Sequence, residues 1–123
     1  MFHKKTHDLK HGIVSDDTFL TEIIHPVHNK EDPKTPYSLA HAQLEPNTQS
    51  RPHVLTESIE TYIIIKGVGE ISIENEKEQV YPGSIIIVPP KQIQHIKNTG
   101  LTILEFYCIV SPPWTQKYDT IVF

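Results

Sequence analysis

The sequence predicts an all-β fold in a single domain, on the basis of its β-branched residues, its short apolar segments and its length. Isoleucine, valine and threonine contribute 17, 8 and 11 of the 123 residues, against only 2 alanines and 7 leucines. β-Branched side chains lose rotamer freedom in a helix but pack well on a pleated sheet. A chain of this length buries one hydrophobic core. We therefore expect a β-sandwich or barrel and no helical bundle.

The first half of the chain contains three strand-like segments. Residues 18–25 (TFLTEIIH) form a β-prone run that Pro26 ends. Residues 37–44 alternate loosely between apolar and polar side chains and lead into a turn at Asn47, a residue type that accepts the left-handed conformation. Residues 53–55 (HVL) are short and apolar. Each segment is short enough to be a strand, and none has the periodicity of an amphipathic helix.

The second half is denser in β-prone residues. Residues 60–66 (ETYIIIK) form a run that Gly67 stops, and residues 70–74 (EISIE) alternate strictly, as a half-buried strand does. Further strands are expected at 78–81, 84–88, 95–98 and 101–110, separated by Pro82-Gly83, Pro89-Pro90 and Gly100. Many short strands with proline and glycine between them are typical of sandwiches and barrels.

These breaks divide the chain into three parts. An N-terminal leader or strand covers residues 1–17, the barrel covers 18–111, and a C-terminal tail covers 112–123. The tail begins with Pro112-Pro113, which break the last strand, because proline cannot donate to a sheet. We expect the tail to be peripheral.

Composition argues against several partners and locations. The chain has 11 basic and 15 acidic residues, a net charge of −4 and no basic stripe, so no nucleic-acid partner is expected. Residues 1–10 lack the apolar segment of a signal peptide, and no apolar run approaches the ~20 residues of a membrane helix. Cys108 is the only cysteine and cannot form an intrachain disulfide, which favours a reducing compartment. We expect a soluble, cytoplasmic protein without a membrane partner.

Eight histidines in so short a chain raise the question of a metal or acid–base site. Nucleophilic catalysis has little support, because the chain has no G-x-S-x-G, no phosphate-binding glycine loop and no C-x-x-C. A metal ion or a proton-transferring pocket is therefore the chemistry to look for.

Two blocks of spaced residues carry the sharpest signal. The first block contains Asn47, His53, Leu55, Glu60 and Gly67. The second contains Gly83, Pro89, Lys91, Gln94 and Asn98. Their spacing resembles the paired motifs of the cupin superfamily, G-x5-H-x-H-x3,4-E-x6-G and G-x5-P-x-G-x2-H-x3-N. Six of the ten motif positions match, namely His53, Glu60, Gly67, Gly83, Pro89 and Asn98.

The resemblance implies a jelly-roll β-barrel, also called a double-stranded β-helix. Short runs such as RPH, YPGS and PPW are more specifically similar to small single-domain bacterial and archaeal cupins described as mannose-6-phosphate isomerase-like. Such cupins usually form homodimers, and an isolated barrel has sheet edges to cover. A homodimer is therefore expected, with residues 18–24 and the tail around Trp114 as the candidate contact.

In the family, two histidines, a glutamate and a later histidine bind one metal ion inside the barrel. Here Leu55 stands at the second histidine position and Gln94 at the last. The resemblance therefore implies a weakened site of His53, Glu60 and Gln94 for Fe, Mn, Ni or Zn. His25, at the end of an early strand, could add a nitrogen. The alternative is a metal-free pocket in which His53 and Glu60 bond each other and Gln94 orients a ligand.

Two turn glycines of the motifs are also replaced. Asn47 takes the place of the first, and asparagine tolerates a positive φ. Lys91 takes the place of the second, and we expect it to require a different turn.

Strand parity predicts which side chains share a face. If Glu60 points into the barrel, Tyr62 and Ile64 do too, because strand side chains alternate with period two. In the same way Gln94 and Ile96 share a face, and His95 points outward with Lys97. We expect Tyr62, Ile64 and Ile96 to line the pocket, and Arg51 either to meet an anionic ligand at its mouth or to lie in solvent.

Two functions remain open. The first is a metal-dependent enzyme that acts on a small polar, sugar-like or carbonyl substrate by isomerase- or dioxygenase-type Lewis-acid chemistry. A metal-free isomerase would use the same pocket, with His53 as base and Tyr62 as acid. The second function is a non-catalytic small-molecule-binding module that keeps a degraded metal site.

Overall fold

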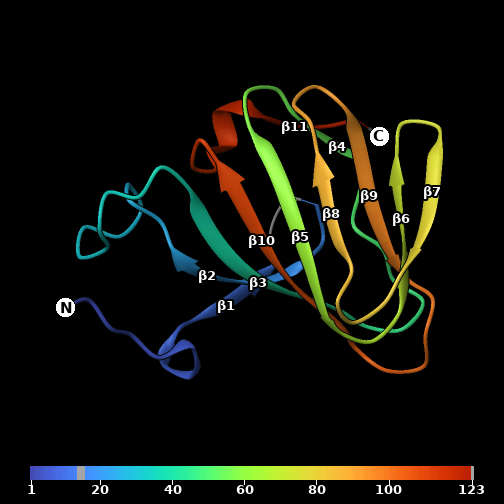
Figure 1. Cartoon of the computed structure of the whole chain (residues 1–123), viewed down its shortest axis with the longest axis horizontal. Coiled ribbons are helices and arrows are strands. Elements are labelled where there is room, and N and C mark those ends of the chain that lie inside the picture. The colour runs from blue at the N-terminus through green and yellow to red at the C-terminus, as the bar shows by residue number, and fades with distance from the viewer. Residues whose placement is uncertain (14–15, 123) are drawn as a thin grey trace.

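The computed structural model describes residues 1–13 and 16–122 and consists of two antiparallel sheets packed face to face (Figure 1). The larger sheet has the order β1 (His11–Ile13), β2 (Phe19–Ile24), β3 (Ser38–Leu44), β10 (Leu104–Ser111), β5 (Ile59–Lys66), β8 (Ile85–Val88). The smaller has the order β11 (Asp119–Ile121), β4 (His53–Leu55), β9 (Ile93–Asn98), β6 (Gly69–Ile73), β7 (Glu76–Val80). This is a jelly roll whose two sheets are not closed into a continuous barrel, and the all-β prediction is confirmed.

Helical structure is confined to two short 3-10 turns in the described chain. They are η1 (Thr6–Asp8) and η2 (Gln116–Tyr118), each of three residues. Within residues 1–13 and 16–122, therefore, no helix has the length and apolar character that crossing a membrane requires.

The strands predicted from the apolar segments all form, but the expectation that the tail is peripheral is wrong. After Pro112 and Pro113 the chain returns to the smaller sheet, where β11 pairs with β4. In this pairing Ile121 lies opposite His53 and Asp119 lies opposite Leu55. The reason is that Thr120 and Ile121 are again β-branched and form one more short strand, β11.

The core lies between the sheets and confirms the predicted parity. Phe106, Ile64, Ile96 and Leu104 are at most 1% exposed. On β9 the alternate residues Gln94, Ile96 and Asn98 are buried, whereas Lys97 is exposed. Likewise Glu60, Tyr62 and Ile64 of β5 all face the interior. On β5 and β9, polar side chains therefore share the inner face of the strand with core side chains. The polar groups lie in the space between the two sheets for this reason.

The turns keep the backbone conformations that the glycine motifs require. Gly67 has a φ of +83°, and a Cβ there would lie 2.6 Å from the carbonyl oxygen of Ile103. Asn47 and Lys91, which replace two motif glycines, have φ values of 65° and 72°. The expectation of a different turn at Lys91 is therefore wrong: the residue keeps the left-handed conformation, and its N–H donates to Leu55 O at 2.8 Å.

Replacing Gly67 by alanine should destabilise the fold, because the new methyl group meets backbone atoms and the φ is unfavourable for any L side chain. We expect Gly67→Ala to lower the free energy of unfolding by about 2 to 4 kcal/mol, measured by urea denaturation. Gly12→Ala is the matched control, since a Cβ at Gly12 meets nothing within 4 Å. Equal losses in the two variants would contradict the steric argument.

Candidate active site

A small pocket lies between the two sheets beneath the C-terminal tail. It has a volume of about 100 Å³ and is lined by residues of β2, β3, β5 and β10 on one side and of β4 and the tail on the other. Besides Ser38 and Cys108, its polar lining contains the acidic and histidine residues Asp16, Glu22, His53, Glu60 and Asp119. Its walls are apolar, with Leu20, Val110 and Trp114 among them. Four carboxyl groups and one imidazole therefore line a largely apolar space.

His53 is held in one orientation by the tail. Its Nδ1 lies 2.9 Å from Asp119 Oδ1, and the other Asp119 oxygen accepts a hydrogen bond from the Trp114 indole at 2.8 Å. An ionised carboxylate can only accept, so Nδ1 carries the proton and Nε2 of the neutral ring is the free base. Nε2 lies 3.6 Å from Asp16 Oδ2. The arrangement leaves the basic nitrogen on the side of the acidic lining.

The charges around His53 raise its pKa. Burial by itself lowers the pKa of the ring, but the hydrogen bond to Asp119 and the negative charges of Glu60, Asp119 and Asp16 outweigh it. Burial raises the pKa of Asp16, and His53 offsets only part of that effect. The pKa values of His53 and of Asp16 are therefore both shifted upward, the first by neighbouring negative charge and the second by burial.

Glu60 is the most perturbed carboxyl group of the pocket. Burial raises its pKa to about 7, although the charge of His53 and a hydrogen bond from the Cys108 thiol pull the pKa down. Among the described residues, Glu60 Oε1 has no hydrogen-bond partner although it is buried. A buried carboxyl oxygen without a partner is costly and is most often found at functional sites. At neutral pH Glu60 is thus close to half protonated and can donate or accept a proton.

Tyr62 and Gln94 form a second, deeper layer. The Tyr62 hydroxyl donates to Gln94 Oε1, and both side chains are at most 3% exposed. Burial raises the pKa of Tyr62 well above its usual range. Tyr62 and Ile96 line a cavity of about 30 Å³ under the main pocket, together with Glu60. Ile64 is part of the hydrophobic core.

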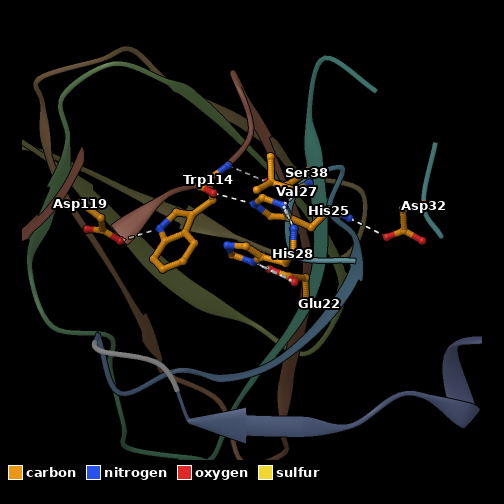
Figure 2. Close-up of polar contacts among 8 residues, drawn as sticks. All are labelled: Glu22, His25, Val27, His28, Asp32, Ser38, Trp114 and Asp119. Carbon is orange, nitrogen blue, oxygen red and sulfur yellow. Dashed lines mark hydrogen bonds and ion pairs between the residues drawn. The ribbon is translucent and has the colours of Figure 1, made fainter. Parts of the chain in front are cut away.

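His25 contacts the backbone of Trp114, as Figure 2 shows. Its Nε2 lies 2.6 Å from the Trp114 carbonyl oxygen, and its Nδ1 accepts from the N–H groups of Val27 and His28 at 3.2 and 3.1 Å. Because Nδ1 accepts, Nε2 must be the protonated nitrogen. Both ring nitrogens of His25 are therefore used, and it holds the tail in place instead of entering the pocket.

The donor set at the family's metal position does not fit a metal ion. Leu55 offers only carbon, and Gln94 Oε1 is bonded to Tyr62. In the part of the chain that the structure describes, the group of His, Cys, Asp or Glu close enough to hold an ion is Glu22, His25 and His28, whose ligand atoms lie within 4.8 Å of one another. His28 Nδ1 is 2.9 Å from a Glu22 oxygen, and its ring stacks on His25 at 3.5 Å (Figure 2).

The structure brings together only some of the residues that the sequence singled out. His53 and Glu60 line the same pocket, whereas Gln94, Tyr62 and Ile96 lie beneath it. Arg51 is exposed, and its backbone N–H donates to Asp16 O at 2.6 Å.

Sequence reasoning missed several lining residues, Asp16, Glu22, Cys108, Trp114 and Asp119. None belongs to the two motifs. The closing Pro-Pro-Trp was the one signal that the tail could matter.

The jelly-roll fold, with a polar pocket between its two sheets, places this protein in the class of double-stranded β-helix proteins. Comparison with known proteins agrees. The family model of the cupin domain, Cupin_2, matches residues 40–110. An uncharacterized protein of Methanocaldococcus jannaschii, MJ1618, is 31% identical over 109 residues, which are 89% of this chain and 85% of that protein. The chain belongs to the cupin family.

Two solved structures show how closely the fold is shared. The polyketide cyclase RemF of Streptomyces resistomycificus superposes with a TM-score of 0.80 at 19% identity, covering 100% of this chain and 86% of that one. The Streptomyces nucleoside dehydratase Pac13 superposes with a TM-score of 0.78 at 15% identity, covering 99% and 91%. At these identities the likeness concerns the fold alone. The mannose-6-phosphate isomerase-like subtype stays a prediction.

Removing the carboxylate of Asp119 should lower the pKa of His53, because the hydrogen bond and the charge of Asp119 both favour the protonated ring. The change is Asp119→Asn, and the measurement is an NMR titration of the imidazole nitrogens. Glu105→Gln is the matched control, since Glu105 is the partner of His41, at 3.0 Å, and not of His53. An unchanged pKa of His53 in the Asp119→Asn variant would contradict the contact between Asp119 and His53.

Glu60 should make the folded protein less stable as the pH rises. Its pKa is about 7 in the fold against an ordinary value of 4.5, so between these pH values the fold holds a proton that the unfolded chain has lost. The free energy of unfolding therefore falls by up to about 3 kcal/mol as the pH rises from 4.5 through 7. Glu60→Gln should remove this slope in urea denaturation series. Parallel pH profiles for the two proteins would contradict it.

Proposed function

We propose that this cupin is an enzyme that transfers protons on a small, polar, uncharged substrate, as in an isomerisation, epimerisation or dehydration, with His53 as general base. The observation that carries the proposal is the fixed orientation of His53. Asp119 and Trp114 hold the ring, and its Nε2 faces the acidic lining of the pocket, 3.6 Å from Asp16 Oδ2. A base oriented by a carboxylate is the arrangement that proton abstraction requires.

Glu60 is suited to be the acid that works with this base. It lines the same pocket, its Oε1 has no partner among the described residues, and its pKa of about 7 keeps a large protonated fraction at neutral pH. In an isomerisation, His53 Nε2 takes the proton of a C–H next to a carbonyl while Glu60 gives a proton to the carbonyl oxygen. When the C–H carbon also carries a hydroxyl, an enediol results; His53 then gives its proton to the former carbonyl carbon, and the Glu60 carboxylate takes the proton of the other hydroxyl, which becomes the new carbonyl. Tyr62, bonded to Gln94 in the deeper layer, is not needed for this step.

The pocket also defines a substrate class. Four carboxylates and one imidazole line it, so a phosphate or carboxylate group would meet like charges at close range. A volume of about 100 Å³ holds a molecule of a few heavy atoms, or the reacting end of a larger one. We therefore propose a neutral hydroxycarbonyl compound and not a sugar phosphate.

A metal-dependent version of the enzyme would need an Fe, Mn, Ni or Zn ion. Glu22, His25 and His28 are the residues close enough to hold one in the described chain, and Glu22 also lines the pocket. Such an ion would supply a Lewis acid at the pocket wall. Binding requires His25 to give up a hydrogen bond, and the parallel rings direct their nitrogens side by side instead of toward one point. For this reason we place the chemistry on His53 and Glu60.

The proposal is tested by following solvent deuterium into dihydroxyacetone, glycolaldehyde and erythrulose by NMR, in buffer containing EDTA. We expect the wild-type protein to exchange at least one of these probes, and His53→Gln to reduce the rate by about 100-fold or more. Glu105→Gln, outside the pocket, should keep the wild-type rate. Dihydroxyacetone phosphate should exchange much more slowly than dihydroxyacetone.

Three results would overturn the proposal. Absence of exchange with every probe would favour the non-catalytic binding module. A His53→Gln variant as active as wild type would place the base elsewhere. Loss of exchange in EDTA, with about one equivalent of a transition metal in untagged protein, would favour the metal-dependent version.

A further inference from the structure

The N-terminal segment, residues 1–13, is attached to β2 and to the loop that follows it. At the end of the segment, β1 pairs with β2, so that His11 lies opposite Thr21 (Figure 1). Nearer its start, Lys4 Nζ lies 2.5 Å from Asp32 Oδ1 and donates to the carbonyl oxygen of Ile23 at 2.6 Å. The Lys4 side chain is only 19% exposed. Lysines near a chain terminus are ordinarily solvated, so a lysine withdrawn from water marks a specific contact.

Asp32 is the buried end of this contact. Its side chain is 2% exposed, its Oδ2 accepts the N–H of His25 at 2.8 Å, and its Oδ1 faces Lys4. Apart from the ion pair, Oδ1 has no hydrogen-bond partner among the described residues. A buried ion pair that loses one partner leaves an uncompensated charge, which is strongly unfavourable. Without the charge of Lys4, the Asp32 carboxylate is driven toward water and its bond to His25 is weakened.

The loop after β2 links Asp32 to the C-terminal tail. Asp32 fixes the backbone of His25, and His25 Nε2 donates to the Trp114 carbonyl oxygen at 2.6 Å. The Trp114 indole donates to Asp119 at 2.8 Å, and the other oxygen of Asp119 lies 2.9 Å from His53 Nδ1. The dashed lines in Figure 2 show this series from Asp32 as far as Asp119. A displacement of Asp32 is therefore expected to reach the His53 ring.

We propose that Lys4 is a positioning residue, and that the N-terminal segment is a strap whose closure on Asp32 fixes the orientation of the His53 ring. Lys4 lies outside the pocket lining and acts through Asp32 and the tail. For the reaction, this inference rests on the proposed function, because a general base must be aligned with the proton that it removes. The orientation of the ring is a property of the fold and can be measured separately.

The burial of the ion pair distinguishes this role from simple fastening of the N-terminus. A fastening contact can form at the surface, where an ion pair avoids the cost of desolvation. Lys4 instead pairs with a buried carboxylate that also holds the backbone of His25. The loop has a separate contact of its own, in which Lys34 Nζ donates to the Pro26 carbonyl oxygen at 2.6 Å. Lys4 therefore determines where the Asp32 carboxylate lies.

The test replaces Lys4 by methionine, which keeps most of the side-chain length and removes the charge. We expect Lys4→Met to stay folded by circular dichroism and to change the ring NMR resonances of His25 and His53 at a fixed pH. The deuterium-exchange rate at saturating substrate should fall by about tenfold, with little change in KM. Lys5→Met is the matched control, since Lys5 is exposed, and it should match wild type in both measurements. If Lys4→Met does not fold, Lys4→Gln, which keeps a donor for the Ile23 carbonyl, replaces it.

A second substitution tests whether Lys4 acts through Asp32. Asparagine at position 32 can still accept the His25 N–H, but it carries no charge that needs a partner. In the double variant Lys4→Met/Asp32→Asn, we therefore expect the His53 resonances to return toward those of wild type. The exchange rate should recover to within about twofold of the wild-type rate, whereas two independent defects would add.

The opposite results overturn the proposal. Unchanged His25 and His53 resonances in folded Lys4→Met would show that Lys4 fastens only the terminus. Equal changes in Lys5→Met would assign the effect to the loss of any positive charge. A double variant as impaired as Lys4→Met would exclude Asp32 as the intermediary.

The strap and the proposed function fail separately. If the wild-type protein exchanges none of the probes, the proposed function fails, and the NMR comparison still decides whether Lys4 orients His53. Changed His53 resonances together with an unchanged exchange rate would support the strap and contradict the role of His53 as the base.

Discussion

The hydrogen bond between His53 Nδ1 and Asp119 Oδ1 connects the last strand to the barrel and sets the chemistry of the pocket at the same time. It belongs to the tail, which also contributes the Trp114 indole bond to Asp119 and the Trp114 carbonyl contact with His25. Both oxygens of Asp119 and both nitrogens of His25 are occupied, so the tail is held on the barrel at two points. Because Nδ1 donates to Asp119, the neutral imidazole of His53 has one tautomer, and its Nε2 faces Asp16. Fold and site are determined together by these few contacts.

The layer beneath the pocket explains how the chain does without the family's full ligand set. Leu55 and Gln94 stand where two histidines are usual, and both are buried. A buried amide must be hydrogen-bonded, and the Tyr62 hydroxyl satisfies Gln94. Leu55 needs no partner. With Leu55 and Gln94 in place of two histidines, the layer beneath the pocket has its polar groups hydrogen-bonded within the layer. His53 and Glu60 are then the motif residues that face the pocket.

Local patterns in the sequence predict most of the fold and part of the site. Alternation predicted that Gln94 and Ile96 point inward, and a period of two is sufficient for that inference. Motif spacing predicted His53 and Glu60. Asp119 could not be predicted, because it meets His53 through a pairing 66 residues away that no local pattern encodes. His25 could not be assigned either, since its role depends on a backbone carbonyl of Trp114. Every residue has a backbone carbonyl, so the sequence gives no sign of which residue will accept a hydrogen bond through it.

The acidic lining itself argues that the pocket is functional. Three carboxyl groups, Asp16, Glu60 and Asp119, act on one imidazole, and burial raises the pKa of Asp16 and of Glu60. The raised pKa of Glu60 costs the fold stability that is lost progressively between pH 4.5 and about 7, and glutamine at position 60 would avoid this loss. A structural ion pair would satisfy both oxygens of each carboxylate, yet Glu60 Oε1 has no partner within the described chain. Proteins keep unfavourable buried charges chiefly at sites where a bound substrate supplies the missing interaction partner. The unpaired oxygen, the oriented imidazole and the apolar walls are consistent with a pocket completed by a substrate that can receive and return a proton.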